Sequence, residues 1–117
     1  MKLNQTHFKK FKKYCEFYVE KFKLDNWEIA FDWIEDNKEG RAKVIPNISG
    51  YIATLYLSDE WYGYDKICDN DIKNVAKHEV IHIILARLSE NGNTRFLSID
   101  DFKESEEELV RKLEKLL

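Results

Sequence analysis

The sequence predicts an α+β fold in which a helix precedes a sheet of about three antiparallel strands and two helices follow it. Apolar residues recur every three or four positions near the start of the chain, alternate with polar residues in the middle, and return to helical spacing in the second half. The chain has 117 residues, of which 44% are hydrophobic and 14% aromatic. Residues 1–117 are therefore expected to form one domain with a real core.

The first helix is predicted over residues 5–22, where apolar side chains form one stripe opposite several lysines. Its members are Phe8, Phe11, Tyr14, Cys15, Tyr18 and Phe22. Residues 27–33 alternate between apolar and polar, as in a strand with one buried face. A second strand is expected over residues 42–48, and Pro46 favours its placement at the edge of the sheet. Residues 51–57, YIATLYL, are β-branched and aromatic and predict the third strand.

Helical spacing resumes over residues 72–88, and Asn91 and Gly92, which tolerate positive φ, are expected to end this helix. The last helix is expected to carry an apolar stripe to the end of the chain. This stripe comprises Phe102, Leu109, Val110, Leu113 and Leu116.

The helix over residues 72–88 contains His-Glu-x-x-His, made of His78, Glu79 and His82. Residues i and i+4 lie on the same helix face, so both histidines can bind one ion. Glu79 is turned about 100 degrees away and can act as a base beside the ion. We expect one Zn²⁺, with metal-bound water attacking a peptide carbonyl and Glu79 as the general base. The alternative is two core histidines with hydrogen-bond partners and a surface glutamate.

A catalytic zinc site needs a third protein ligand, and His7 is the only other histidine. Cys68 lies near the start of the helix and is expected to be too far away. A carboxylate of the last helix is the best remaining candidate. Glu106 interrupts the predicted buried stripe and is the preferred ligand, with Glu107 as the alternative. The competing interpretation is an acidic first turn that complements the helix dipole.

Composition argues against nucleic-acid binding, membrane insertion and a disulfide-stabilised fold. The formal net charge is −3, so no nucleic-acid partner is expected, although a lysine cluster at residues 9–13 keeps a DNA-associated protease as an alternative. No apolar run reaches the roughly 20 residues of a membrane helix, and no secretory signal is visible. Two cysteines are too few for a disulfide framework. We therefore expect a cytoplasmic protein with reduced thiols.

Three segments resemble a minimal zincin of the gluzincin type, similar to small HExxH metallopeptidases of phages and prophages. They are the strand YIATLYL, the helix IKNVAKHEVIHIILARL and the closing helix EEELVRKLEKLL. SprT-like and ImmA-type domains share the first half of the site. The resemblance implies a zinc metallopeptidase that acts on a peptide or protein substrate. It also implies a glutamate ligand on a later helix, which maps onto Glu106 or Glu107.

In zincins the strand before the active-site helix often pairs with the extended substrate. By this resemblance residues 51–57 are expected to form an edge strand that binds substrate through Tyr51, Ala53 and Leu55. Many zincins also use a tyrosine or histidine to stabilise the oxyanion, and the candidates here are Tyr62, Tyr64 and Arg95. The alternative function is a catalytically silent module that keeps the zincin fold and its metal site.

Overall fold

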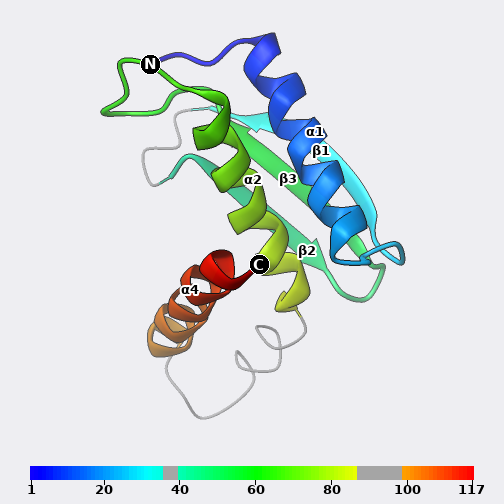
Figure 1. The fold of residues 1–117 in the computed structure, drawn as a ribbon. Helices are drawn as coiled ribbons and strands as arrows, with labels where there is room; N and C mark the ends of the chain where they lie inside the picture. The colour runs from blue at the N-terminus through cyan, green and yellow to red at the C-terminus, as the bar shows by residue number, and fades with distance from the viewer. Residues whose placement is uncertain (36–39, 87–98) are drawn as a thin grey trace.

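The computed structural model describes residues 1–35, 40–86 and 99–117. Figure 1 shows the elements in chain order, and all those expected from the sequence are present. They are α1 (Gln5–Lys21), β1 (Glu28–Ile34), β2 (Ala42–Asn47), β3 (Ile52–Ser58), α2 (Asp69–Ile84) and α4 (Ile99–Leu116). The α+β class with a helix before the sheet is confirmed.

Helix α1 begins at a capping box. The backbone N–H of His7 donates to Asn4 Oδ1, and the backbone N–H of Asn4 donates to His7 Nδ1, both at 3.0 Å. His7 is thus engaged at a helix start and takes no part in the site described below. The predicted stripe of α1 is confirmed, because Phe11, Cys15 and Tyr18 are buried.

The expectation of an all-antiparallel sheet is wrong. The strand order is β1-β3-β2, with β3 antiparallel to β2 but parallel to β1. Among the described strands, only β2 and β3 form a hairpin, through the turn at residues 48–51. The alternation of apolar and polar residues determines which face of a strand is buried, but it does not determine which strand lies next to it. Pro46 does lie in an edge strand, as predicted, because β2 is at one side of the sheet.

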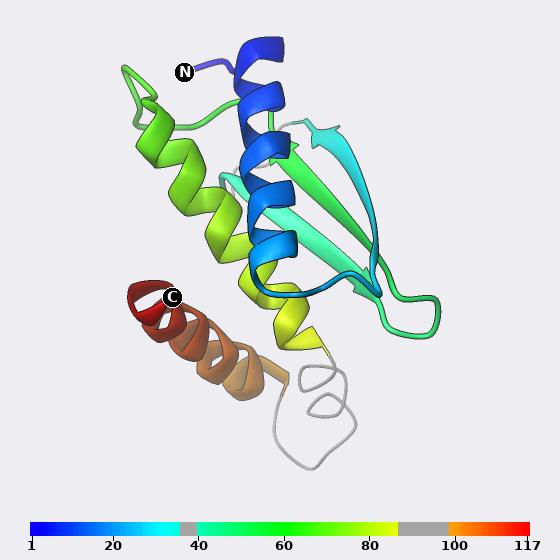
Figure 2. The same cartoon turned by 45° about the vertical axis from the view of Figure 1, so that its right-hand side comes forward.

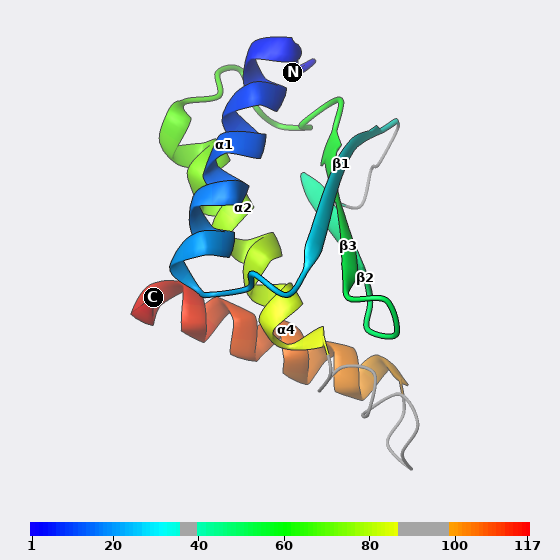
Figure 3. The ribbon, with the colours of Figure 1, turned by 90° about the vertical axis from the view of Figure 1, so that its right-hand side faces the viewer.

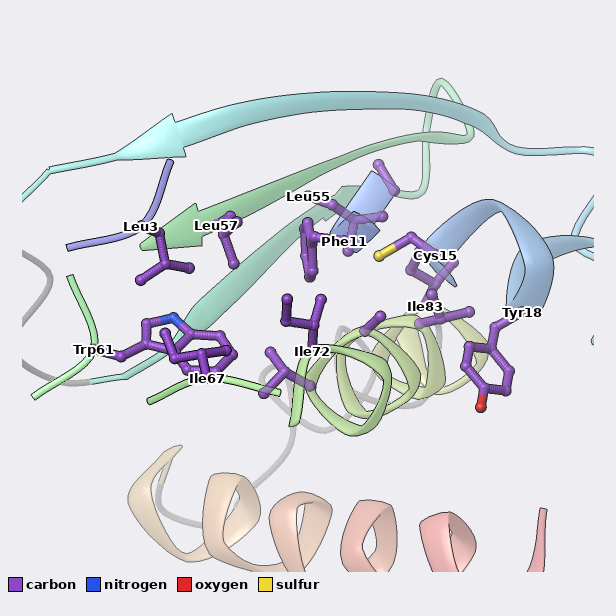
Figure 4. Close-up of a cluster of buried hydrophobic side chains, with 14 residues drawn as sticks. Leu3, Phe11, Cys15, Tyr18, Leu55, Leu57, Trp61, Ile67, Ile72 and Ile83 are labelled. Carbon is purple, nitrogen blue, oxygen red and sulfur yellow. The ribbon is translucent and has the colours of Figure 1, made fainter. Parts of the chain in front are cut away.

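Helices α1 and α2 lie side by side on one face of the sheet (Figure 2). The buried core fills the space between this helix pair and the strands, as Figure 4 shows for Phe11, Leu55 and Ile72. Each of these three side chains is fully buried. Because α2 packs on both α1 and β2, its position in the molecule is closely defined.

The HExxH helix is shorter than expected. Helix α2 ends at Ile84 with Leu85 at the C-cap, so it stops before Asn91 and Gly92, which lie outside the described residues. Helix α4 then runs across the C-terminal half of α2 (Figure 3). Within the described ranges, no helix is long and apolar enough to cross a membrane.

Candidate metal centre

Helix α2 presents the two histidines of HExxH toward α4. Its apolar residues Ile72, Val75 and Val80 are buried, and Ile72 and Val80 are fully so. His78 and His82 are one turn apart and keep 21% and 16% of their side-chain surface exposed. They are therefore partly shielded by α4 and yet open to a small ligand.

Three ligand atoms converge between α2 and α4. The Nε2 atoms of His78 and His82 lie 3.3 Å apart. Glu107 places Oε1 at 2.7 Å from His82 Nε2 and Oε2 at 3.3 Å from His78 Nε2. Within the described part of the chain, these three residues form a group able to hold a metal ion.

Two of the three separations within this group fit a zinc ion. With Zn–N and Zn–O distances of about 2.0–2.1 Å, two ligand atoms of a tetrahedral site are about 3.3–3.4 Å apart. The two Nε2 atoms are 3.3 Å apart, and Glu107 Oε2 is also 3.3 Å from His78 Nε2, in agreement with this value. Glu107 Oε1 is closer to His82 Nε2, at 2.7 Å. Two histidines and one carboxylate are also a donor set that catalytic zinc sites use. The residues present therefore fit the ion.

Two further carboxylates contact the other ring nitrogens. Glu114 pairs with His78 Nδ1, and Glu106 Oε2 lies 3.4 Å from His82 Nδ1. Histidines that ligate metals usually donate their free ring N–H to a carboxylate or carbonyl, which fixes the tautomer and the ring orientation. Here both imidazoles have such a partner, so each ring directs Nε2 toward Glu107.

The preference for Glu106 over Glu107 is not supported by this geometry. Glu106 contacts the Nδ1 atom on the outer side of His82, and Glu107, the alternative, reaches both Nε2 atoms. The predicted stripe of α4 is confirmed at Val110 and at the partly buried position of Glu106, but not at Leu109 and Leu116. Leu109 and Leu116 are 37% and 80% exposed, and Val110 is fully buried. Glu106 is more buried than Glu107, with 13% of its side-chain surface exposed against 37%. The contacts with the ring nitrogens, and not burial, therefore favour Glu107 as the ligand.

Glu114 was missed by the sequence-based reasoning. It lies seven residues after Glu107 and four after Val110, so all three share one face of α4. The sequence signal for Glu114 was a helix face on which Val110 lies between two carboxylates. An apolar stripe does not mark this face.

Glu79 lies beside the ligand group in a buried position. Only 8% of its surface is exposed. Burial raises the pKa of its carboxyl group, and the neighbouring His82 and His78 lower it only in part. A carboxylate with a raised pKa holds a proton more readily, as a general base requires.

His82 is more basic than an ordinary histidine. Burial lowers its pKa, but the contact with Glu106 and the negative charges of Glu79 and Glu107 outweigh that effect. The pKa of His82 is therefore raised to about 8. At neutral pH a proton occupies this ring and competes with any metal ion.

Two hollows flank the centre along β2. One has a volume of about 480 Å³ and includes Arg41, Ala42 and His78. The other has a volume of about 510 Å³ and includes Val44 and His82. Both hollows also reach Glu79 and Glu107. The strand beside the site is therefore β2.

The expectation that residues 51–57 form a substrate-binding edge strand is wrong in its placement. Strand β3 is central and pairs with β1 and β2 on its two sides. Ala53 and Leu55 are fully buried in the core. Tyr51 precedes β3 in the turn and packs against Trp27, with ring centroids 5.4 Å apart. None of the three lines the two hollows.

The candidates for oxyanion stabilisation are not brought into the site directly. Tyr64 accepts a hydrogen bond from Arg41 Nη1 at 2.9 Å, and it is Arg41 that lines the hollow next to His78. Tyr62 is 51% exposed and lines neither hollow. Arg95 lies outside the described residues. Cys68 caps α2, and its thiol lies 3.0 Å from Asp71 Oδ2, so it serves the helix start.

Comparison of the chain with protein-family models, with curated proteins and with solved structures finds no match.

Proposed function

We propose that this protein is a zinc-dependent peptide hydrolase with a zincin-like arrangement of its active site. The observation that supports it is the convergence of His78, His82 and Glu107 beside the buried carboxyl group of Glu79. Partners on both Nδ1 atoms add to this support, because a preorganised ligand shell is typical of a functional metal site.

His78, His82 and Glu107 would hold the ion, and Glu79 would transfer the proton. A bound Zn²⁺ lowers the pKa of water and polarises a carbonyl group. Glu79 takes a proton from the attacking water as the carbon–oxygen bond forms. It then delivers that proton to the amine nitrogen as the carbon–nitrogen bond breaks. The raised pKa of Glu79 suits both roles.

The substrate would lie along β2. Among the described strands β2 pairs with β3 alone, so its other side can accept an extended peptide by backbone hydrogen bonds. Ala42 of this strand lines both hollows, and Val44 lines the one on the His82 side. A peptide in this position would place one of its bonds next to Glu79.

The test compares wild-type protein with Glu79→Gln. Zinc content is measured by mass spectrometry, and turnover is measured on a proteome-derived peptide library in which new chain ends are identified. We expect both proteins to bind one zinc. Glu79→Gln should lose turnover by at least about 100-fold, because the proton has no acceptor.

Glu108→Gln is the matched control, because Glu108 is exposed on α4 and pairs only with Lys112 in the described part of the chain. This variant should keep both zinc and turnover. Zinc uptake without any turnover in the wild type would favour the silent metal-binding module. Failure of the wild type to take up zinc would reject both functions.

A further inference from the structure

Two arginines line the hollow on the His78 side of the centre, one from each wall. Arg41 directly precedes β2, and Arg111 lies on α4, one turn after Glu107. The hollow of about 480 Å³ also contains Val75. It is large enough for a side chain or a chain end of a peptide.

Arg41 is held in place at both its backbone and its side chain. Its carbonyl oxygen accepts hydrogen bonds from Trp61 Nε1 at 2.9 Å and from the backbone N–H of Ser58 at 3.0 Å. Its guanidinium donates to the Tyr64 hydroxyl at 2.9 Å. The Tyr64 ring packs edge-on against the buried Trp61 at 5.2 Å. Within the described ranges its guanidinium makes this one hydrogen bond, so four of its five N–H donors remain for a ligand.

Three carboxylates also line this hollow, and that of Glu79 is largely buried. Glu114 pairs with His78 Nδ1, and Glu107 faces the two Nε2 atoms. Arg111 forms no ion pair with a carboxylate of the described residues. Two guanidinium groups therefore border the hollow with most of their donors unused. Guanidinium groups bind carboxylates in a paired, planar geometry.

We propose that this arginine-lined hollow binds a carboxylate of the substrate next to the cleaved bond. The carboxylate is either an Asp or Glu side chain or the C-terminal group of the peptide. The inference rests on the proposed function and names the substrate class of the same site. Tyr64 acts as a positioning residue, because it orients Arg41 and does not line the hollow.

The experiment measures peptide binding to zinc-loaded Glu79→Gln, so that no probe is consumed. The probes are labelled hexapeptide amides of fixed apolar sequence in which Glu, or Gln as its neutral match, is placed at each position in turn. A free-acid version of the apolar peptide is compared with its amide. We expect Glu at one position, or the free acid, to bind about tenfold or more tightly than its neutral match.

Arg41→Gln and Arg111→Gln should each reduce this preference to less than about threefold and leave binding of the neutral peptides unchanged. Tyr64→Phe should reduce it partly. Lys112→Gln removes the same charge from α4 at a residue outside the hollow and should keep the full preference. Thermal melting of each variant checks that the fold is retained.

Equal binding of Glu and Gln peptides, with zinc bound, would overturn the inference and leave the proposed function standing. Equal weakening of acidic and neutral peptides in Arg41→Gln would also overturn it, because that result indicates a contact with the peptide backbone. Absence of zinc in the starting protein would reject the proposed function and the inference together.

Discussion

At the scale of the residue, the two ring nitrogens of each histidine have different partners. The Nε2 atoms face each other and Glu107, and the Nδ1 atoms face Glu106 and Glu114. In the proposed site, this division would make Glu107 a ligand and Glu106 and Glu114 orienting groups. Their contributions to metal binding should therefore differ in size.

We predict that Glu107→Gln weakens zinc binding more than Glu106→Gln or Glu114→Gln. The first variant removes a ligand, and the other two remove outer partners, whose loss typically costs about 10–100-fold in affinity. Competition with a chromophoric chelator measures all three affinities. A greater loss in Glu106→Gln than in Glu107→Gln would identify Glu106 as the ligand.

We predict that zinc affinity rises with pH up to about 8 and then levels. The pKa of His82 is about 8 without the metal, and zinc binds only the neutral imidazole. Below this pKa the proton must leave, so the affinity should fall about tenfold for each pH unit between 8 and 6. Chelator competition across this range measures the slope. A flat profile would contradict the assignment of His82 as a ligand.

At the scale of the element, local patterns predicted each helix and strand well. Tertiary contacts determine the rotation of α4 against α2 and the order of the strands. His78 and His82 share a helix face by spacing alone, so this half of the site could be predicted. The third ligand depends on how α4 rotates against α2. That rotation is set by the buried Val110 and by Glu106, Glu107 and Glu114, and an apolar stripe cannot reveal it.

The order of the strands could not be predicted from the sequence for a similar reason. Alternation along β1 and β3 marks their buried faces, but their parallel pairing arises because β2 lies on the far side of β3. The same topology makes β2 the strand beside the candidate site. The expectation that the substrate pairs with residues 51–57 assumed that strands consecutive in the chain are neighbours in the sheet. It therefore selected β3 instead of β2.

We predict that Val110→Ala destabilises the packing of α4 and weakens zinc binding with it. Val110 is fully buried and lies on the helix face that carries Glu107. Loss of two methyl groups from such a position costs roughly 1–3 kcal/mol in the free energy of unfolding. Urea denaturation measures this cost, and chelator competition measures the metal affinity.

The neighbouring Leu109→Ala is the control, because Leu109 is 37% exposed on the same helix. It should leave both quantities nearly unchanged. Equal effects of the two variants would mean that Val110 does not determine how α4 docks.

At the scale of the whole molecule, two helices carry the candidate ligands, and of the two only α2 contributes to the core cluster among the described residues. Helix α2 packs on α1 and β2, and α4 packs mainly on α2. The facing surface of α4 carries Glu106, Glu107 and Glu114 near the buried Glu79. These negative charges repel one another, and a bound divalent cation would offset the repulsion more than the protonated His82 does.

We predict that zinc stabilises the protein and that chelation reverses the effect. An ion that binds only the folded state adds about 2.7 kcal/mol when its free concentration is 100 times its dissociation constant. Thermal melting with zinc and with excess chelator measures the difference. In His78→Ala and His82→Ala this difference should vanish. An equal shift in these variants would place the ion elsewhere.

The sharing of ligands between α2 and α4 also has a consequence for exchange rates. Two ligands of a bound ion would sit on a helix embedded in the core, and the third would sit on a helix with contacts mainly to its neighbour. The ion would therefore leave when α4 swings away, long before α2 unfolds. Its residence time would report how often that swing occurs, and a cross-link between the two helices would lengthen it.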